Sequence, residues 1–285
     1  MKIMVLGASG MLGNAVFKHL AADPRYDVWG TVRSAAVFKY FSAAEQSRLL
    51  NGVDVLNQDD LLSLLNEHRP AVIINCTGLI KQLSTANDPL AVLPINSLLP
   101  HRLQKMASLI DARLVHVSTD CVYAGDKGMY VEADASDAQD LYGKSKYIGE
   151  VSDASNAITL RTSIIGHELT SNKSLIDWFL SQAGAVKGFR RAIFSGLPTV
   201  EIGRIIGDYV LPNAQLNGLY HVSAEAINKF SLLEKVAKIY GKSVSITADD
   251  SLVIDRSLDS SRFREATGYV PPSWDDLIAS MRDFK

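Results

Sequence analysis

A tyrosine and a lysine stand four residues apart in the segment Tyr142-Gly143-Lys144-Ser145-Lys146, which has the pattern of a helix start. Residues i and i+4 of a helix lie on one face, so we expect the phenol of Tyr142 to lie near the ammonium group of Lys146. A nearby cation lowers the pKa of a phenol from its usual value of about 10. The pair is therefore predicted to exchange a proton with a carbonyl or hydroxyl oxygen while a hydride moves at the carbon.

A threonine at the end of an apolar run strengthens this prediction. Val117-Ser118-Thr119-Asp120 closes the run that we predict as a strand over residues 114–118. Ligands of parallel α/β sheets bind at the carboxyl ends of the strands, where the Thr119 hydroxyl would orient a substrate oxygen. Thr119, Tyr142 and Lys146 are therefore the predicted catalytic residues.

A glycine-rich segment predicts where a cofactor binds. Gly7-Ala8-Ser9-Gly10-Met11-Leu12-Gly13 directly follows a predicted strand over residues 2–6 and opens a predicted helix over residues 11–22. Glycines let the backbone turn tightly and approach a pyrophosphate, and the helix N-terminus offers that group free N–H donors. The segment predicts a dinucleotide site. Its expected contacts are Gly7, Ser9, Gly10, Met11, Leu12 and Gly13.

The end of the second predicted strand, residues 28–32, indicates which dinucleotide binds. An NAD site usually has an acidic residue there for the ribose 2′-hydroxyl. This chain has Arg33, whose planar guanidinium can pair with a 2′-phosphate, so NADP(H) is the expected cofactor. Asp54 and Val55, in a third predicted strand over residues 53–56, are expected at the adenine. Two plainer interpretations stay open, in which Arg33 is a solvated loop residue and Asp54 is a turn residue.

Strand and helix patterns alternate strictly up to residue 163, which implies a parallel sheet covered by helices on both faces. The expected fold is a Rossmann-like, doubly wound α/β fold with a smaller, mostly C-terminal α/β substrate domain. The predicted NADP(H)-binding domain comprises residues 1–163 and 197–223, and the substrate domain comprises residues 164–196 and 224–285. The remaining expected elements are helices over residues 35–50, 59–67, 90–109, 141–155 and 175–183, and strands over residues 71–76, 158–162 and 219–222.

The totals exclude several classes of protein. The chain has 285 residues and a net charge of -2, so neither a nucleic acid nor a membrane surface is an expected partner. No apolar run approaches the ~20 residues that a membrane-spanning helix needs. Cys76 and Cys121 lie in or beside apolar runs, which favours a reducing cytoplasm over a disulfide scaffold. No metal site is expected, and a homodimer is left open.

Together these motifs resemble the extended short-chain dehydrogenase/reductase family, and within it the dTDP-4-dehydrorhamnose reductases. The resemblance covers nearly the whole chain, including residues 7–13, 118–123, 142–146, 160–163, 197–199, 218–223 and 258–263. It implies that the chain reduces a 4-keto (deoxy)sugar nucleotide for polysaccharide biosynthesis. NADPH would give the hydride and Tyr142 the proton, while Lys146 would also bind the nicotinamide ribose. We further expect Cys76, Thr77, Gly78 and Asn96 to contact the cofactor, and Asn96 matches an asparagine of the family.

The sugar nucleotide is expected to contact a further set of residues: Lys81, Asp120, Cys121, Val122, His167, Arg190 and Arg191. The two arginines belong to a basic loop over residues 187–191. We expect this loop to bind a diphosphate, and a solvated loop is an equally good interpretation.

Cys121 leaves the reaction partly open. Related dehydratases carry a proton-abstracting glutamate at its position, and a neutral thiol is a poor substitute, so dehydration is not expected. An epimerase–reductase that resembles GDP-fucose synthase is one alternative, in which Cys121 and His167 exchange protons beside the keto group. The other is a non-catalytic NADP-binding regulatory subunit, as in methionine adenosyltransferase, which shares much of the motif.

Overall fold

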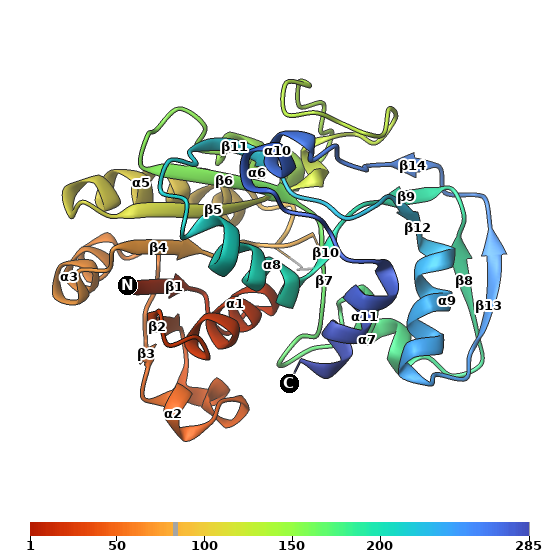
Figure 1. Cartoon of the computed structure of the whole chain (residues 1–285), viewed down its shortest axis with the longest axis horizontal. Coiled ribbons are helices and arrows are strands. Elements are labelled where there is room, and N and C mark those ends of the chain that lie inside the picture. The colour runs from red at the N-terminus through yellow and green to blue at the C-terminus, as the bar shows by residue number, and fades with distance from the viewer. Residues whose placement is uncertain (82–84, 285) are drawn as a thin grey trace.

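The computed structural model describes residues 1–81 and 85–284. Over these residues a seven-stranded parallel sheet has the strand order β11-β6-β5-β4-β1-β2-β3 (Figure 1). The order reverses between β1 and β4, as in the predicted doubly wound fold, and ligands bind at such a reversal. Its strands are β1 (Lys2–Leu6), β2 (Asp27–Val32), β3 (Leu49–Asn51), β4 (Val72–Asn75), β5 (Arg113–Thr119), β6 (Ala157–Thr162) and β11 (Gly218–His221).

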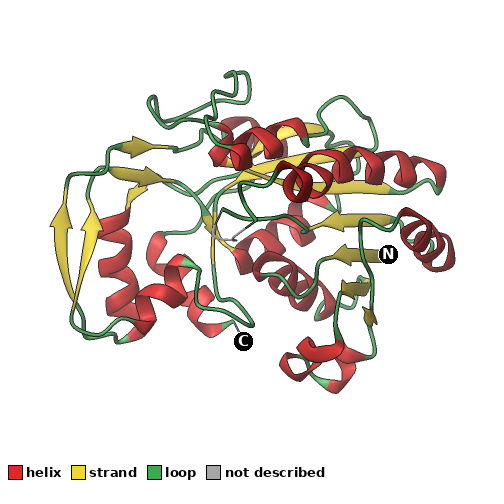
Figure 2. Ribbon diagram, turned by 180° about the vertical axis from the view of Figure 1, so that it is seen from behind, coloured by secondary structure: helices red, strands yellow, loops and turns green. Residues whose placement is uncertain are grey.

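Helices cover both faces of this sheet (Figures 1 and 2). The helical segments that follow the strands up to residue 122 are α1 (Met11–Ala21), η1 (Ala35–Tyr40), α2 (Ala43–Gln46), α3 (Gln58–His68), α4 (Pro89–Leu93), η2 (Pro94–Leu98), α5 (Leu99–Leu109) and η3 (Asp120–Val122). The later ones are α6 (Leu141–Ile148), α7 (Leu175–Ser181), α8 (Thr199–Ile205), η4 (Ile206–Val210), α9 (Lys229–Tyr240), α10 (Ser261–Thr267) and α11 (Trp274–Asp283). No helix in the described part of the chain is long and apolar enough to cross a membrane.

The alternation of side chains along the strands divides the core into two layers. In β1, Ile3 and Val5 belong to the apolar cluster that includes α1 and α8. Met4 and Leu6 belong to the cluster that includes α3 and α5. Successive residues of a strand point to opposite faces, so the apolar run Ile3–Leu6 of β1 buries both faces of the sheet.

The remaining strands form small sheets outside the main one. β7 (Ile164–Ile165) pairs with β10 (Leu197–Pro198). β9 (Ala192–Phe194) lies between β12 (Ile227–Asn228) and β14 (Ile254–Asp255), and β8 (Ala185–Phe189) pairs with β13 (Ser245–Asp249). In Figure 1, β8, β13 and α9 form the right-hand end of the molecule, away from the main sheet. The boundaries of two separate domains stay a prediction.

Two predicted elements near the N-terminus are wrong. The third strand is Leu49–Asn51, which pairs with β2, and the apolar run over residues 53–56 is a turn. Gly52, with φ of +80°, ends that strand. The helix predicted over residues 35–50 is two short segments, because Ser34 caps η1 and Ser42 caps α2 through a capping box with Glu45.

Three further boundaries differ from the predictions. Helix α6 ends at Ile148 with Gly149 as its C-cap, well before residue 155. The predicted basic loop is largely the strand β8, because residues 185–189 pair with β13. The helix predicted over residues 90–109 is continuous but contains a π-helical segment, η2, between α4 and α5. Within it the Leu99 N–H donates to the Pro94 carbonyl, five residues earlier.

Candidate active site

The loop between β1 and α1 has the form that a pyrophosphate requires. Gly7 has φ of +82°, and a Cβ on Gly13 would lie 2.1 Å from the Gly7 carbonyl oxygen, so both positions require glycine. Gly10 is the N-cap of α1, which has neither a side-chain cap nor an acidic residue in its first turn. The first N–H groups of α1 are therefore free to bind an anion. Ser9, Met11 and Leu12 complete this loop.

Arg33 follows β2 directly, beside the glycine loop. The Thr31 hydroxyl and carbonyl oxygens accept from the N–H groups of Gly7 (3.1 Å) and Ala8 (2.9 Å), which ties β2 to that loop. The Arg33 side chain is exposed, with no hydrogen bond or ion pair to any described residue. Its charge is free to pair with a phosphate that reaches the end of β2.

Asp54 and Val55 lie in the turn after β3. Asp54 is exposed, and its carboxylate accepts from the Leu56 N–H at 2.9 Å. Val55 is half-buried. Asp54 is therefore a turn residue. The expectation that Asp54 and Val55 lie in the third strand is wrong.

The residues after β4 border the glycine loop and are held by Asn96. A Cβ on Gly7 would lie 3.0 Å from Thr77 Cγ2 and 3.4 Å from the Cys76 carbonyl oxygen. The next residue, Gly78, lies beside the Asn96 side chain. Asn96 is 1% exposed, and its amide bonds to both main-chain groups of Leu79 (2.9 and 3.0 Å). It also donates to Ser145 Oγ at 3.1 Å, so Asn96 connects this loop to α6.

The three predicted catalytic residues meet at the end of β5. Thr119 is the last residue of β5, and Tyr142 and Lys146 lie on successive turns of α6. The Thr119 side chain lies close enough to the Tyr142 phenol to lower its pKa. Lys146 Nζ donates to the Val117 carbonyl oxygen at 2.7 Å. The strand end and the helix thus bring a hydroxyl, a phenol and an ammonium group to one place.

Local packing fixes α6 against the end of β5. Asp140 is the N-cap of α6, and its carboxylate accepts from the Gly143 N–H at 2.7 Å. A Cβ on Gly143 would lie 2.2 Å from the Cys121 carbonyl oxygen, so only glycine allows this approach. The glycine directly after Tyr142 therefore sets how closely the phenol approaches η3.

The expectation that Lys146 lowers the pKa of Tyr142 below its usual value is wrong. Burial raises the pKa of the Tyr142 phenol, the negative charge that Cys121 gains on deprotonation raises it further, and the neighbouring Thr119 side chain lowers it. Lys146 itself is 5% exposed, and burial lowers its pKa to about 8 against the opposing charge of Glu150. The Lys146 ammonium group points to the Val117 carbonyl, and desolvation outweighs its effect on the phenol.

Lys81 and the residues of η3, which are expected to contact the substrate, lie beside the triad. Lys81 forms an ion pair with Asp140 at 2.6 Å, and its Nζ lies 5.5 Å from the centre of the Tyr142 ring. Asp120 and Val122 are buried in η3, and Cys121 between them is partly buried. Burial raises the pKa of Asp120, and it raises the pKa of the Cys121 thiol to about 11. Cys121 is therefore a neutral thiol at neutral pH.

No pattern in the sequence indicates Arg256, which reaches this group of residues from the C-terminal part of the chain. Its Nε donates to the Tyr123 carbonyl oxygen at 2.8 Å, and its Nη1 lies 3.6 Å from Cys121 Sγ. A lone arginine after a two-residue strand carries no local pattern. Only the fold brings residue 256 beside residue 121.

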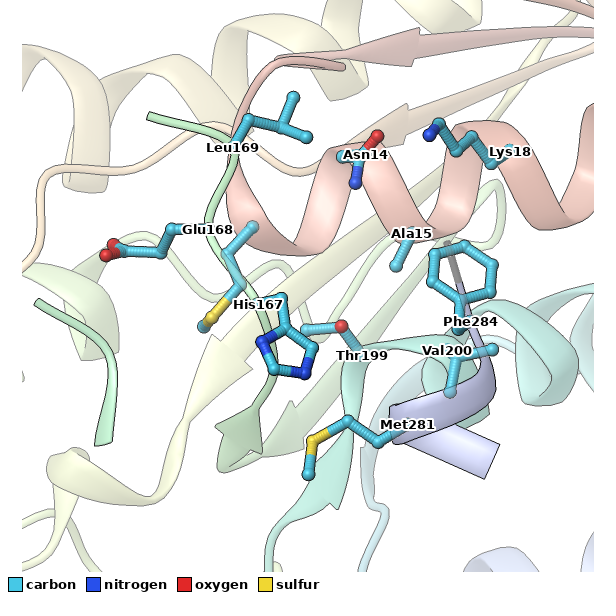
Figure 3. Close-up of a pocket in the computed structure, with 11 residues that line it drawn as sticks. Asn14, Ala15, Lys18, His167, Glu168, Leu169, Thr199, Val200, Met281 and Phe284 are labelled. Carbon is cyan, nitrogen blue, oxygen red and sulfur yellow. The ribbon is translucent and has the colours of Figure 1, made fainter. Parts of the chain in front are cut away.

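His167 lies in a different place from Cys121. Its Nδ1 is 2.5 Å from Asp177 Oδ1, and its Nε2 is 2.8 Å from the Tyr240 hydroxyl. It lines a cavity of about 180 Å³ between α1, α8 and the C-terminal end of the chain. Figure 3 shows Asn14 and Phe284 around His167 there. The triad and Cys121 are not among the residues that line this cavity, and both ring nitrogens of His167 have partners.

Arg190 and Arg191 lie in the turn between β8 and β9. Both are exposed, and Arg190 forms an ion pair with Asp250. The structure therefore favours the solvated-turn interpretation for Arg190.

A buried ion pair that the sequence did not indicate lies beneath the triad. The guanidinium of Arg161 bonds to the Glu150 carboxylate at 2.5 Å, and their side chains are 2% and 5% exposed. Glu150 also accepts from Ser118 Oγ at 2.6 Å, beside the catalytic threonine. Arg161 Nη1 donates to the Tyr123 hydroxyl and contacts His221 Nε2 at 3.0 Å. These bonds connect β5, β6, β11 and the segment that follows α6.

Comparisons with known proteins agree with this arrangement. Residues 1–283 match the family model described as RmlD substrate binding domain. A dTDP-4-dehydrorhamnose reductase from Aggregatibacter actinomycetemcomitans is 25% identical over 313 aligned positions, which cover 99% of each chain. Methionine adenosyltransferase 2 subunit beta from Mus musculus is 29% identical over 149 positions, covering 52% of this chain and 41% of that protein.

A solved structure shares the whole fold. The dTDP-4-dehydrorhamnose reductase from Bacillus anthracis str. Ames, in complex with NADP, superposes with a TM-score of 0.80 and 19% identity. The match covers 99% of this chain and 98% of that one. At this identity the likeness concerns the fold. Because the family model matches almost the entire length of this chain, the chain belongs to the RmlD substrate binding domain family.

Proposed function

We propose that this chain is an NADPH-dependent oxidoreductase that reduces the 4-keto group of a (deoxy)sugar nucleotide. The observation that carries the proposal is the meeting of Thr119, Tyr142 and Lys146 at the end of β5, with Cys121 and Lys81 beside Tyr142. The relatives named as dTDP-4-dehydrorhamnose reductases support the substrate class.

The glycine loop and Arg33 suit the expected dinucleotide. Without a Cβ at Gly7 and Gly13, and with uncapped N–H groups at the start of α1, the chain can hold a pyrophosphate against its backbone. Arg33 would take the 2′-phosphate. When bound, NADPH supplies the hydride that the carbonyl carbon accepts.

The side chains of this chain supply the proton and the orientation. The Thr119 hydroxyl and the Tyr142 hydroxyl both hydrogen-bond to the substrate carbonyl oxygen. Because its pKa is raised, Tyr142 is fully protonated at neutral pH and can donate its proton to that oxygen as the carbon accepts a hydride. Lys146 then stabilises the resulting phenolate, which regains its proton from water.

The direct test measures NADPH consumption with dTDP-4-dehydrorhamnose and with the corresponding UDP- and GDP-linked 4-keto sugars. We expect turnover with at least one of them and formation of the 4-hydroxy sugar. NADPH binding without turnover of any member of this panel would overturn the proposal. That result would favour the alternative, a regulatory NADP-binding protein. The match to methionine adenosyltransferase 2 subunit beta over half of this chain supports this alternative.

The epimerase–reductase alternative has less support. It needs a second proton carrier near Cys121, and His167, the residue expected for that part, is held by Asp177 and Tyr240 in a separate cavity. We therefore favour reduction without epimerisation.

A further inference from the structure

Main-chain hydrogen bonds of Asp255 and Arg256 to two other segments fix the position of Arg256. The Asp255 N–H donates to the Gly125 carbonyl oxygen at 2.7 Å, and the Arg256 N–H donates to the Ile193 carbonyl oxygen at 3.2 Å. A Cβ on Gly125, which has φ of +98°, would lie 2.4 Å from Ile254 Cγ1 and 3.0 Å from Arg256 Cγ. The close approach of these two segments therefore depends on glycine, and it holds the arginine in one position before any ligand binds.

One edge of the guanidinium is available to a ligand. Nε is used by the Tyr123 carbonyl and Nη1 by Cys121 Sγ, while no hydrogen bond joins Nη2 to any described residue. Within the described part of the chain no carboxylate lies within ion-pair distance of Arg256, although the buried Asp120 carboxylate interacts with it at longer range. A partly buried arginine with an unused donor edge is well suited to accept a hydrogen-bonding oxygen from a ligand.

The position of Arg256 decides which part of a sugar nucleotide it would contact. The carbonyl to be reduced must lie within hydrogen-bond reach of Thr119 and Tyr142. The Cys121 main chain packs against α6 directly after Tyr142, since a Cβ on Gly143 would lie 2.2 Å from the Cys121 carbonyl oxygen. Arg256 Nη1 in turn lies 3.6 Å from Cys121 Sγ. The ring carbons next to the carbonyl therefore lie nearest to Arg256. In a 4-keto hexose the diphosphate is attached to C1, on the opposite side of the ring from C4.

We propose that Arg256 is a specificity-determining residue, whose free edge donates to an oxygen on C3 or on the C6 group attached to C5, the two ring carbons next to the reduced carbonyl. This inference rests on the proposed function, because it assumes that a keto sugar lies against the triad. The oxygen belongs to a ring hydroxyl or to a carboxylate. A diphosphate is a different ligand group, and contact with it would contradict the proposal.

The test compares Arg256→Met with wild type in the full-length chain loaded with NADP⁺, using calorimetric binding. The probes are the glucose, 6-deoxyglucose and glucuronic acid derivatives of UDP, dTDP and GDP, together with the three free nucleoside diphosphates. We expect Arg256→Met to weaken binding of the sugar nucleotides by roughly 10- to 100-fold, with the free diphosphates and NADP⁺ unaffected. Loss confined to glucuronic acid identifies a carboxylate, and loss shared by all three sugars identifies a ring hydroxyl.

Two control variants separate this effect from a structural one. Arg25→Met removes an exposed arginine whose ion pairs are to Asp23 and Asp208, and should change none of these affinities. Arg256→Lys keeps the charge but loses the planar fork, so it should restore binding only in part.

Two results would overturn the inference. Equal weakening of the free diphosphates would make Arg256 a diphosphate contact, and unchanged affinities throughout would make it a structural link to Tyr123. If wild type binds no sugar nucleotide, the proposed substrate class fails and the inference fails with it. If it binds them without turnover, only the reduction fails.

Discussion

The two ends of the candidate site are built from different parts of the chain. The pyrophosphate part of the cofactor end consists of backbone: seven consecutive residues, Gly7–Gly13, form a loop whose shape depends on the lack of side chains at its glycines. The substrate end consists of side chains, among them Lys81, Cys121, Asp140 and Arg256, which are far apart in the sequence. A site of this kind can keep its cofactor while its substrate changes, because the two ends share few residues.

The largest effect is expected at Tyr142, the predicted proton donor of the triad between the two ends. Tyr142→Phe removes the proton donor and keeps the ring, so turnover should fall by about 10²- to 10⁴-fold while NADPH binding is unchanged. Tyr147→Phe is the matched control, since Tyr147 is an exposed tyrosine on the same helix. Near-normal turnover by Tyr142→Phe would show that another group gives the proton.

A change at Gly13 should break the cofactor end alone. In Gly13→Ala the new Cβ would meet the Gly7 carbonyl oxygen at 2.1 Å, so the loop must move. Strain of this kind costs about 1–3 kcal/mol, and we expect NADPH affinity to fall by roughly 10- to 100-fold. Titration with NADPH measures the affinity, and thermal unfolding measures the stability. A lower melting temperature with unchanged NADPH affinity would make Gly13 a packing residue only.

The charge at the end of β2 should set the choice between the two dinucleotides. Arg33→Asp replaces the free cation by an anion that repels a 2′-phosphate, so the preference for NADPH over NADH should fall by at least about tenfold. Lys39→Asp makes the same charge change in η1, a few residues further on, and should leave the preference unchanged. The ratio of kcat/KM for the two cofactors is the measurement. An unchanged ratio in Arg33→Asp removes the role assigned to Arg33.

The pKa of Lys146 predicts how catalysis depends on pH. Burial favours the neutral amine and lowers its pKa to about 8, so Lys146 is cationic below that pH and loses its charge above it. Because the cation is needed beside Tyr142, kcat/KM should fall about tenfold for each pH unit above 8. A pH profile of kcat/KM checks this. A profile that stays flat for two units above 8 would mean that the free enzyme does not need the charged form.

The smallest effect is expected at Cys121. Cys121→Ser should leave the reduction rate within a few-fold of wild type, and wild type should add no deuterium beside the keto group in D₂O. Mass analysis of the product measures both the reduction and the exchange. Deuterium at C3 or C5 that disappears in Cys121→Ser would instead establish an epimerase–reductase, and a carrier other than His167 would then have to be found.

Residues that act through local geometry could be predicted from the sequence. The glycine loop, the strand end at Thr119 and the spacing of Tyr142 and Lys146 depend on neighbours within seven residues. The parallel sheet follows from the alternation of apolar runs and helices, and it is confirmed with the expected strand reversal.

The features that could not be predicted depend on contacts between distant segments. The apolar run over residues 53–56 has the composition of a strand, yet Leu49–Asn51 pairs with β2 and Gly52 turns the chain away. The direction of the pKa shift of Tyr142 depends on how deeply α6 is buried, which spacing does not show. Arg256 contacts Cys121 across more than one hundred residues of sequence, so no local pattern marks it.

The π-helical segment η2 makes the site sensitive to the length of the chain as well as to its composition. Within η2 the hydrogen bonds run from each N–H to the carbonyl five residues earlier, which accommodates one residue more than an α-helix would. Deleting Ile95 would let the helix become regular, but the residues that now form the π-helical turn, Asn96 among them, would shift around the helix axis. Asn96 would then lose Leu79 and Ser145 together. A one-residue deletion, which a surface helix commonly tolerates, would here separate the loop after β4 from the helix that carries the catalytic tyrosine.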